Sequence, residues 1–496
     1  MTRQRKGPPP EQLLAAAPVK SLIWTFALPA ILSQVVGAMH NIVDQTFIGW
    51  GLGDVAIAAT NIAFPLATLT TALAALIGMG GAAGFSLRLG KGDRETASQG
   101  WGNAILLSLG VGCLLAVLAV LFLRPMLRLF GATQAMMVYA APYALVISLG
   151  LPAAIFSTAM AHFIRADGSP RFSSGVLLSG AVFNMIFDPI FLFLLDLGIQ
   201  GVALATVLGQ VLSSLLTLYY LVRKKRMVTL PRRAFRLSLP VIGSIGALGG
   251  ALFFNHVIAT AAQILLMNML RTYGAQSTYG SEIAIAAAGA VGKVMIVLLS
   301  CVIGIALGSQ PILGFNYGRK NYGRVVQTYQ TALVYGTVVA AAAFLCMQLF
   351  PHQILGLFGS DDPLFYAFGT RYIRIYLLMS FLNAFQPITS TFFTSIGKAK
   401  LGFWMALIRQ GLLLMPLLAL LPLVLGLDGV LWAGAVSDGL AAGMVLLAAL
   451  FAVGIAVIVF HDWTRIVDVI GRLFSSWWSG LLTAVYAGAA VWFIFG

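Results

Sequence analysis

Long apolar runs alternate with short polar segments along almost the whole chain. Each run is close to or longer than the roughly 20 residues that a helix needs to cross a bilayer. The pattern predicts an all-α polytopic membrane protein with twelve transmembrane helices. We expect these helices at 21–48, 54–87, 100–123, 138–163, 172–195, 199–222, 237–271, 282–314, 326–350, 366–393, 401–424 and 430–458.

The composition excludes several other classes of protein. Apolar residues make up 60% of the 496 residues and charged residues only 9%, whereas a soluble domain carries about 25% charged residues. A soluble enzyme and a disordered chain are therefore excluded. The three cysteines lie within apolar runs and show no paired spacing, which excludes a disulfide-stabilised secreted domain.

The net charge of +15 comes from basic residues in the loops. If the N-terminus is cytoplasmic, the cytoplasmic segments hold 23 Lys and Arg residues and the opposite side holds five. Basic loops on one side of a membrane protein fix its orientation. We therefore predict a cytoplasmic N-terminus, contact with membrane lipids and no nucleic-acid partner.

The chain contains an internal repeat with an offset of 228 residues. DVAIAA at 54–59 aligns with EIAIAA at 282–287, and LGIQGVALA at 197–205 aligns with LGLDGVLWA at 425–433. Because each copy has six helices, an even number, both copies have the same orientation in the membrane. Parallel repeats related by an axis along the membrane normal are typical of transporters.

The repeat defines the expected domain organisation. The basic segment 223–236 joins the two copies, and 477–495 is apolar and uncharged, which predicts either a thirteenth helix or an interfacial anchor. The segments are an N-terminal cytoplasmic tail at 1–20, an N-lobe at 21–222, a linker at 223–236, a C-lobe at 237–458 and an extension at 459–496.

Three acids lie in the interior of predicted spans rather than at helix ends or in loops: Asp44, Asp188 and Asp438. Ionisable residues inside a membrane are costly and mark functional sites by default. Asn184 lies four residues before Asp188, so both occupy one helix face, and the following proline frees a backbone carbonyl. Thr206 on the next helix adds a hydroxyl. Asp44, Asn184, Asp188 and Thr206 are therefore candidate ligands for an ion.

The second copy lacks these groups, because Leu, Pro and Gly occupy the corresponding positions. Two nearby carboxylates in a low dielectric cannot both be ionised without a proton or a cation. The asymmetry predicts a site for H+ or Na+ in the N-lobe. Buried carboxylates held only by hydrogen bonds between helices are the alternative. We expect no cofactor and no metal ion other than Na+ at these four residues.

Other residues within the spans are weaker candidates. Arg409 and Asp438 lie on adjacent helices, which favours a structural ion pair over a role in a cavity, whereas Lys293 has no evident partner in the sequence. His40 lies one turn before Asp44 and either tunes it or packs near it. The candidate residues for lining a substrate cavity are Gln34, Met39, His40 and His256.

Several enzyme signatures are absent from the sequence. It contains no HExxH, no GxSxG and no P-loop, so we expect neither an enzyme nor an ATP-driven pump. A membrane hydrolase using His40 and Asp44 and a passive channel are minor alternatives.

Several stretches resemble the MATE (multidrug and toxic-compound extrusion) family, across nearly all of 21–458. They are PAILSQVVGAMHNIVDQTFIGWGLG, FNMIFDPIFLF, ALGSQPILGFNYGRKNYGRV and RQGLLLMPLLALLPLVLGLDGV. The resemblance implies a secondary antiporter of the bacterial inner membrane that exports amphipathic organic cations or drugs in exchange for H+ or Na+ by alternating access. It also implies small drug-like substrates, and we expect a monomer.

The resemblance also implies which residues couple transport to the ion. Prokaryotic members with an N-lobe site use an aspartate on the first helix, an Asn-xxx-Asp pair on the fifth and a threonine on the sixth, which match Asp44, Asn184, Asp188 and Thr206. Tyr143 is a weaker match to a tyrosine on the fourth helix. The acids of the C-lobe site in other members are missing here. A lipid-linked sugar flippase of the same superfamily is the alternative function, although it would need several cations in its cavity.

Overall fold

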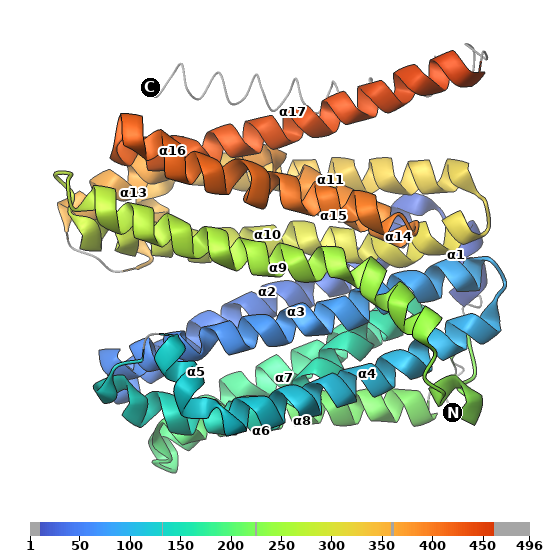
Figure 1. Ribbon diagram of the computed structural model, residues 1–496, viewed down its shortest axis with the longest axis horizontal. Coiled ribbons are helices and arrows are strands. Elements are labelled where there is room, and N and C mark those ends of the chain that lie inside the picture. Colours follow the sequence, from blue (N-terminus) through green and yellow to red (C-terminus); the bar gives the residue numbers. More distant parts are fainter. Residues whose placement is uncertain (1–9, 131, 224–225, 359–361, 461–496) are drawn as a thin grey trace, which may run out of the picture. The chain divides into compact units, whose positions relative to one another are not determined.

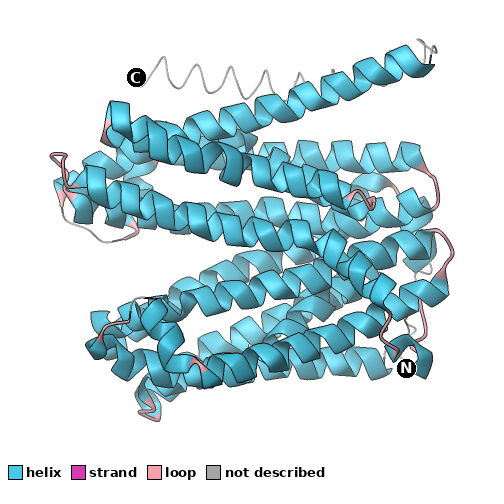
Figure 2. Ribbon diagram, in the orientation of Figure 1, coloured by secondary structure: helices cyan, strands magenta, loops and turns pink. Residues whose placement is uncertain are grey.

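The computed structural model describes residues 10–130, 132–223, 226–358 and 362–460, and these residues form helices joined by short loops (Figure 1, Figure 2). Ten of the described helices are long and apolar enough to cross a membrane. The structure thus confirms a helical membrane fold, and the segment 477–495 lies outside the described residues.

The first six predicted spans correspond to long helices. They are α2 (Val19–Leu52), α3 (Asp54–Gly90), α4 (Arg94–Leu121), α6 (Gln134–Ala166), α7 (Pro170–Pro189) with the π-helix η1 (Ile190–Leu194), and α8 (Gly198–Arg223). A short helix, α5 (Leu123–Leu129), lies between α4 and α6.

The later spans are less regular. They are α9 (Leu239–Gly274), α10 (Ser281–Gly318), α11 (Tyr322–Leu349), α13 (Pro363–Tyr376) with η3 (Ser380–Ala384) and α14 (Phe385–Ser395), α15 (Ala399–Leu407) with the π-helix η4 (Ile408–Leu414) and α16 (Met415–Leu425), and α17 (Leu427–Phe460). Short elements between them are η2 (Arg232–Phe235) and α12 (Pro351–Gly356).

The predicted continuous helix at 366–393 is wrong in detail. The structure breaks it after Tyr376 into a turn and a 3₁₀ segment before α14 begins at Phe385. Pro387 fits the start of α14 near Phe385, because its nitrogen has no hydrogen to donate and its ring would clash with the carbonyl of Asn383 if an α-helix continued through both residues.

The described residues divide into two compact units. Unit 1 comprises those within 1–257, 307–325 and 392–400, and unit 2 comprises those within 258–306, 326–391 and from 401 onward. The predicted lobe boundaries at 222 and 237 stay a prediction.

Unit 1 is a bundle in which α3 packs on α4 and α6, and α8 packs on α6 and α7 (Figure 1). Two glycines equivalent in the repeat, Gly90 and Gly318, meet within this unit. A Cβ atom on Gly90 would lie 3.1 Å from the Cα atom of Gly318 and would overlap the carbonyl of Phe315. Only glycine permits this approach of two backbones.

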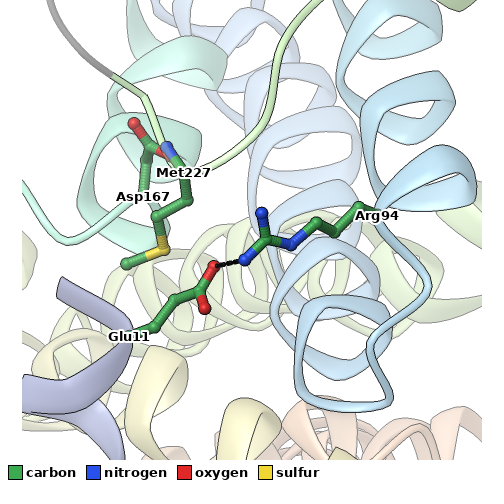
Figure 3. A network of polar contacts seen from close by, with 4 residues as sticks. All are labelled: Glu11, Arg94, Asp167 and Met227. Atoms are coloured by element: carbon green, nitrogen blue, oxygen red, sulfur yellow. Dashed lines mark hydrogen bonds and ion pairs between the residues drawn. The ribbon is translucent and has the colours of Figure 1, made fainter. Parts of the chain in front are cut away.

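The N-terminal segment forms a short helix, α1 (Pro10–Ala16), that the sequence analysis treated only as a tail. Leu14 of α1 is buried, and its carbonyl accepts hydrogen bonds from Asn316 Nδ2 at 3.1 Å and Arg324 Nε at 3.2 Å. Glu11 pairs with Arg94 at 2.7 Å (Figure 3). These contacts anchor α1 within unit 1.

In unit 2, α17 packs against α16, η4 and α13. A large apolar cluster joins α10, α13 and α17 through residues such as Ala287, Phe368 and Leu431.

Candidate ion site

Three helices of unit 1 supply the predicted ion ligands. Asp44 lies on α2, Asn184 and Asp188 on α7, and Thr206 on α8. α7 packs against both α2 and α8. The exposed fractions are 9% for Asp44, 2% for Asn184 and 0% for Asp188, so these polar groups are enclosed in a part of the chain that is otherwise apolar.

The side-chain amide of Asn184 joins Asp188 and Thr206 by hydrogen bonds. Its Nδ2 atom donates to Asp188 Oδ1 at 2.8 Å and to Thr206 Oγ1 at 2.9 Å. The Thr206 hydroxyl in turn donates to the carbonyl of Val202 at 3.2 Å. Both amide hydrogens of Asn184 are therefore used within the cluster, which leaves its carbonyl oxygen as an acceptor.

Asp44 and Asp188 face each other across α2 and α7. Their carboxyl groups lie within hydrogen-bonding range of each other. Two carboxylates cannot donate to one another, so this arrangement requires either a shared proton or a cation between them.

Three buried oxygen atoms of this cluster have no hydrogen-bond donor in the part of the chain that the structure describes: Asp44 Oδ1, Asn184 Oδ1 and Asp188 Oδ2. Buried polar atoms are almost always satisfied. Oxygen atoms that all lack a donor fit a proton or a hard monovalent cation, which prefers oxygen ligands. The described residues contain no group of three or more His, Cys, Asp or Glu side chains that could hold a metal ion.

Two further predicted residues lie at this cluster. His40, one turn before Asp44, lies near the Asn184 side chain, and its buried Nδ1 atom has no hydrogen-bond partner among the described residues. Tyr143 on α6 is half-buried and lies within electrostatic range of both carboxyl groups. It packs against an apolar cluster that includes Ile48. The structure thus brings six of the predicted residues into one region of unit 1.

Arg409 and Asp438 form a separate site in unit 2. Arg409 Nε lies 2.6 Å from Asp438 Oδ1, and the exposed fractions of these side chains are 21% and 4%. Asn383 also hydrogen-bonds Asp438. Tyr376, which the sequence analysis missed, lies within electrostatic range of the pair. Tyr376 follows Tyr372 by four residues and stacks on it, and this spacing is the feature of the sequence that could have identified Tyr376.

The remaining candidates lie elsewhere. On α2, Gln34 is half-buried and Met39 is 47% exposed. His256 on α9 is half-buried. Lys293 is an exposed residue of α10. The structure does not join these four residues to the ion cluster.

A fourth buried acid, Asp167, lies outside the membrane-spanning segments. Asp167, just after α6, accepts a hydrogen bond from the Tyr220 hydroxyl at 2.7 Å and from the Met227 backbone nitrogen at 2.8 Å, and Figure 3 shows it beside Met227. Burial raises the pKa of Asp167 to about 7, although both hydrogen bonds and the charge of Arg226 act to lower it.

Comparison with protein families identifies the chain's relatives. The family model described as MatE matches residues 29–190 and 257–420. The chain is 23% identical over 426 residues to the multidrug export protein MepA of Staphylococcus aureus, which covers 86% of the chain and 92% of that protein. It is 25% identical over 407 residues to MepA of Staphylococcus haemolyticus, with 82% and 88% covered.

Solved structures show the same fold. One is the outward-facing conformation of a multidrug resistance MATE family transporter, with a TM-score of 0.83, 23% identity, and coverage of 91% of this chain and 98% of that one. Another is a MOP superfamily transporter from Pyrococcus furiosus, with the same TM-score, identity and coverage, for which a binding pocket of reverse polarity suggests a different function.

Proposed function

The chain belongs to the MatE family, and on this premise we propose that it is a secondary active multidrug efflux antiporter. It exports amphipathic drugs, organic cations among them, in exchange for inward H+ or Na+ by alternating access. Its relatives include proteins named for multidrug export. We place it in the inner membrane of a bacterium, with its N-terminus in the cytoplasm, on the strength of its basic loops.

One observation carries the antiport proposal: the enclosed oxygen atoms of Asp44, Asn184 and Asp188 that have no donor. A Na+ bound there is coordinated by these oxygen atoms, whereas a shared proton joins the two carboxylates, and either ion removes the repulsion between them. Because Asp44 is on α2 and its partners are on α7, ion binding stabilises the packing of these two helices. Ion release weakens the same packing.

Coupling to the drug then follows from linkage. The ion and the drug must favour different conformations, since a ligand with equal affinity for two states shifts neither. The ion-bound arrangement of α2 and α7 is one of these states. The drug stabilises the other, so that the inward flow of the ion drives export.

The test is export of a fluorescent cation from proteoliposomes that contain the full chain. One set of vesicles carries a Na+ gradient at constant pH, and the other carries a pH gradient without Na+. Acceleration by one gradient identifies the coupling ion. If neither gradient accelerates export, the antiport proposal is wrong.

A further inference from the structure

A single lysine lies within an otherwise uncharged span. From residue 283 to its end at Gly318, α10 contains no charged residue other than Lys293. Lys293 is ten residues from the start of this stretch, or about 15 Å at the rise of an α-helix. This distance is about half the thickness of a bilayer's hydrocarbon core, so the lysine lies near mid-membrane.

Lys293 lies on the open side of α10. Ala284, Ala287 and Val291 are buried in the apolar cluster of unit 2, whereas Lys293 is exposed, as is Ile296 at 59%. The two glycines beside the lysine, Gly289 and Gly292, have nothing within 4 Å of a Cβ atom added to either. The helix surface around Lys293 therefore has room for another molecule.

Lys293 is not paired within the part of the chain that the structure describes. The described residues offer it neither an ion pair nor a hydrogen bond, in contrast to Arg409, which is held at 2.6 Å from Asp438. A lysine at mid-membrane costs several kcal/mol if it faces lipid, and such residues almost always face a bundle interior or a water-filled cavity. The open side of α10 is therefore expected to line a water-filled cavity, which would carry one fixed positive charge.

We propose that Lys293 binds the anionic group of amphipathic substrates and makes the transporter prefer molecules with a carboxylate or sulfonate over matched cations. The open surface beside Gly289 and Gly292 accommodates the apolar body of such a molecule, while the ammonium group binds its acid. This inference rests on the proposed export function and names the class of substrate that Lys293 selects.

A matched pair of dyes tests the preference directly. Rhodamine 110 carries a free carboxylate, and rhodamine 123 is its methyl ester, so the two differ in one negative charge on the same ring system. Their binding to the purified full chain in detergent is measured by fluorescence polarisation, which needs no ion gradient. We expect the free acid to bind wild type about tenfold more tightly than the ester, the effect of one charge-assisted hydrogen bond.

Three variants isolate the charge of Lys293. Lys293→Gln should lose the tenfold preference by weakening the binding of the free acid, and Lys293→Arg should keep it. Lys400→Gln is the matched control, because it is the same substitution at an exposed residue outside the spans. An equal preference in wild type and Lys293→Gln would overturn the inference, as would a loss of preference in Lys400→Gln.

A second measurement separates this inference from the proposed function. A cysteine at 293, in a chain without its three natural cysteines, should react with a membrane-impermeant maleimide, because the cavity is aqueous. Reaction only with a lipid-soluble maleimide would overturn the assignment of the cavity. The dye-binding and labelling results do not depend on ion-driven export. If export fails in the vesicle assay, that failure contradicts the proposed function and leaves the inference about Lys293 untouched.

Discussion

The π-helix η1 in unit 1 and the π-helix η4 in unit 2 are built in similar ways. η1 follows Pro189 at the end of α7, and η4 comes directly before Met415 and Pro416 of α16. In each case the proline removes a backbone hydrogen bond and the helix widens beside it. The two copies of the repeat therefore each have a π-helix next to a proline in this helix, after the proline in the first copy and before it in the second.

The polar groups on these two helices differ in how they are neutralised. Asp188 beside η1 faces Asp44, an acid of the same sign, and oxygen atoms of both lack a donor among the described residues. Arg409 within η4 faces Asp438, an acid of opposite sign, at 2.6 Å. A charge that is balanced inside the protein stabilises one structure, whereas a charge that needs a mobile ion makes the structure depend on that ion.

The largest expected effect is on stability in unit 2. Asp438→Ala leaves the guanidinium of Arg409 largely buried without its carboxylate, and we expect it to lower the free energy of unfolding by about 3–5 kcal/mol. Thermal and denaturant unfolding in detergent measure this. The double variant Arg409→Met, Asp438→Leu should recover most of the loss and keep ion-driven export. Failure of export in a stable double variant would show that the pair has a role in transport.

The next effect is on coupling in unit 1. Asp44→Asn and Asp188→Asn each remove one of the two carboxylates that the ion neutralises, and we expect gradient-driven export to fall by about 100-fold, near the upper end of common coupling factors. Expression and unfolding temperature should change little. Asp196→Asn, at an exposed acid beyond η1, is the control. Full export by both site variants would contradict the site.

A smaller effect is expected at Thr206. Thr206→Val removes the hydroxyl that accepts a hydrogen bond from Asn184 at 2.9 Å, and we expect the apparent affinity for the coupling ion to fall about fivefold, the effect of one neutral hydrogen bond. The dependence of export on ion concentration measures it. Thr217→Val is the control on the same helix, because the Thr217 hydroxyl bonds only the carbonyl of Ser213 among the described residues. Equal shifts in both variants would remove Thr206 from the site.

The last effect is on the pH dependence of stability and concerns Asp167, a buried acid with its own donors. Its pKa is about 7 in the folded protein and 3.8 without burial, so the folded state holds a proton that the unfolded state releases between these values. Stability from this group therefore rises as the pH falls from 8 toward 4. The unfolding temperature of wild type should rise by on the order of 3 °C relative to Asp167→Asn over this range.

Asp167 is buried like Asp188, but Tyr220 and Met227 donate hydrogen bonds to it. We therefore expect Asp167→Asn to leave ion-coupled export unchanged, which would show that burial alone does not make an acid part of the ion site. A pH-independent difference in unfolding temperature between wild type and the variant would contradict the raised pKa of Asp167.

Much of the fold and of the candidate site was predictable from the sequence. Apolar runs of sufficient length predict transmembrane helices whatever their neighbours, because the bilayer leaves the backbone few other structures. The free-energy cost of a polar group in a bilayer identifies Asp44, Asn184 and Asp188 as candidate site residues, since they lie within otherwise apolar helices. The internal repeat added that the first copy carries these polar residues and that the second copy has apolar residues at the positions corresponding to Asn184 and Asp188.

Details that depend on neighbouring elements were not predictable. Three features depend on contacts between segments far apart in the chain. They are the break between Tyr376 and Phe385, the packing of α1 against Asn316 and Arg324, and the inclusion of 307–325 in unit 1. Hydropathy averages over a window and carries no information on such contacts.

The sequence by itself determined that this protein is a helical membrane protein with an internal repeat. It also determined that the fifth helix carries an acid in the first copy of the repeat and that the corresponding helix of the second copy does not. The reason is that the energetic cost of charge in a bilayer acts on each residue separately. Only the tertiary structure decided which charges are balanced. Asp188 faces a second acid, Arg409 faces Asp438, and Lys293 is exposed. The physical reason is that electrostatic energy depends on the distance between groups, and folding sets that distance.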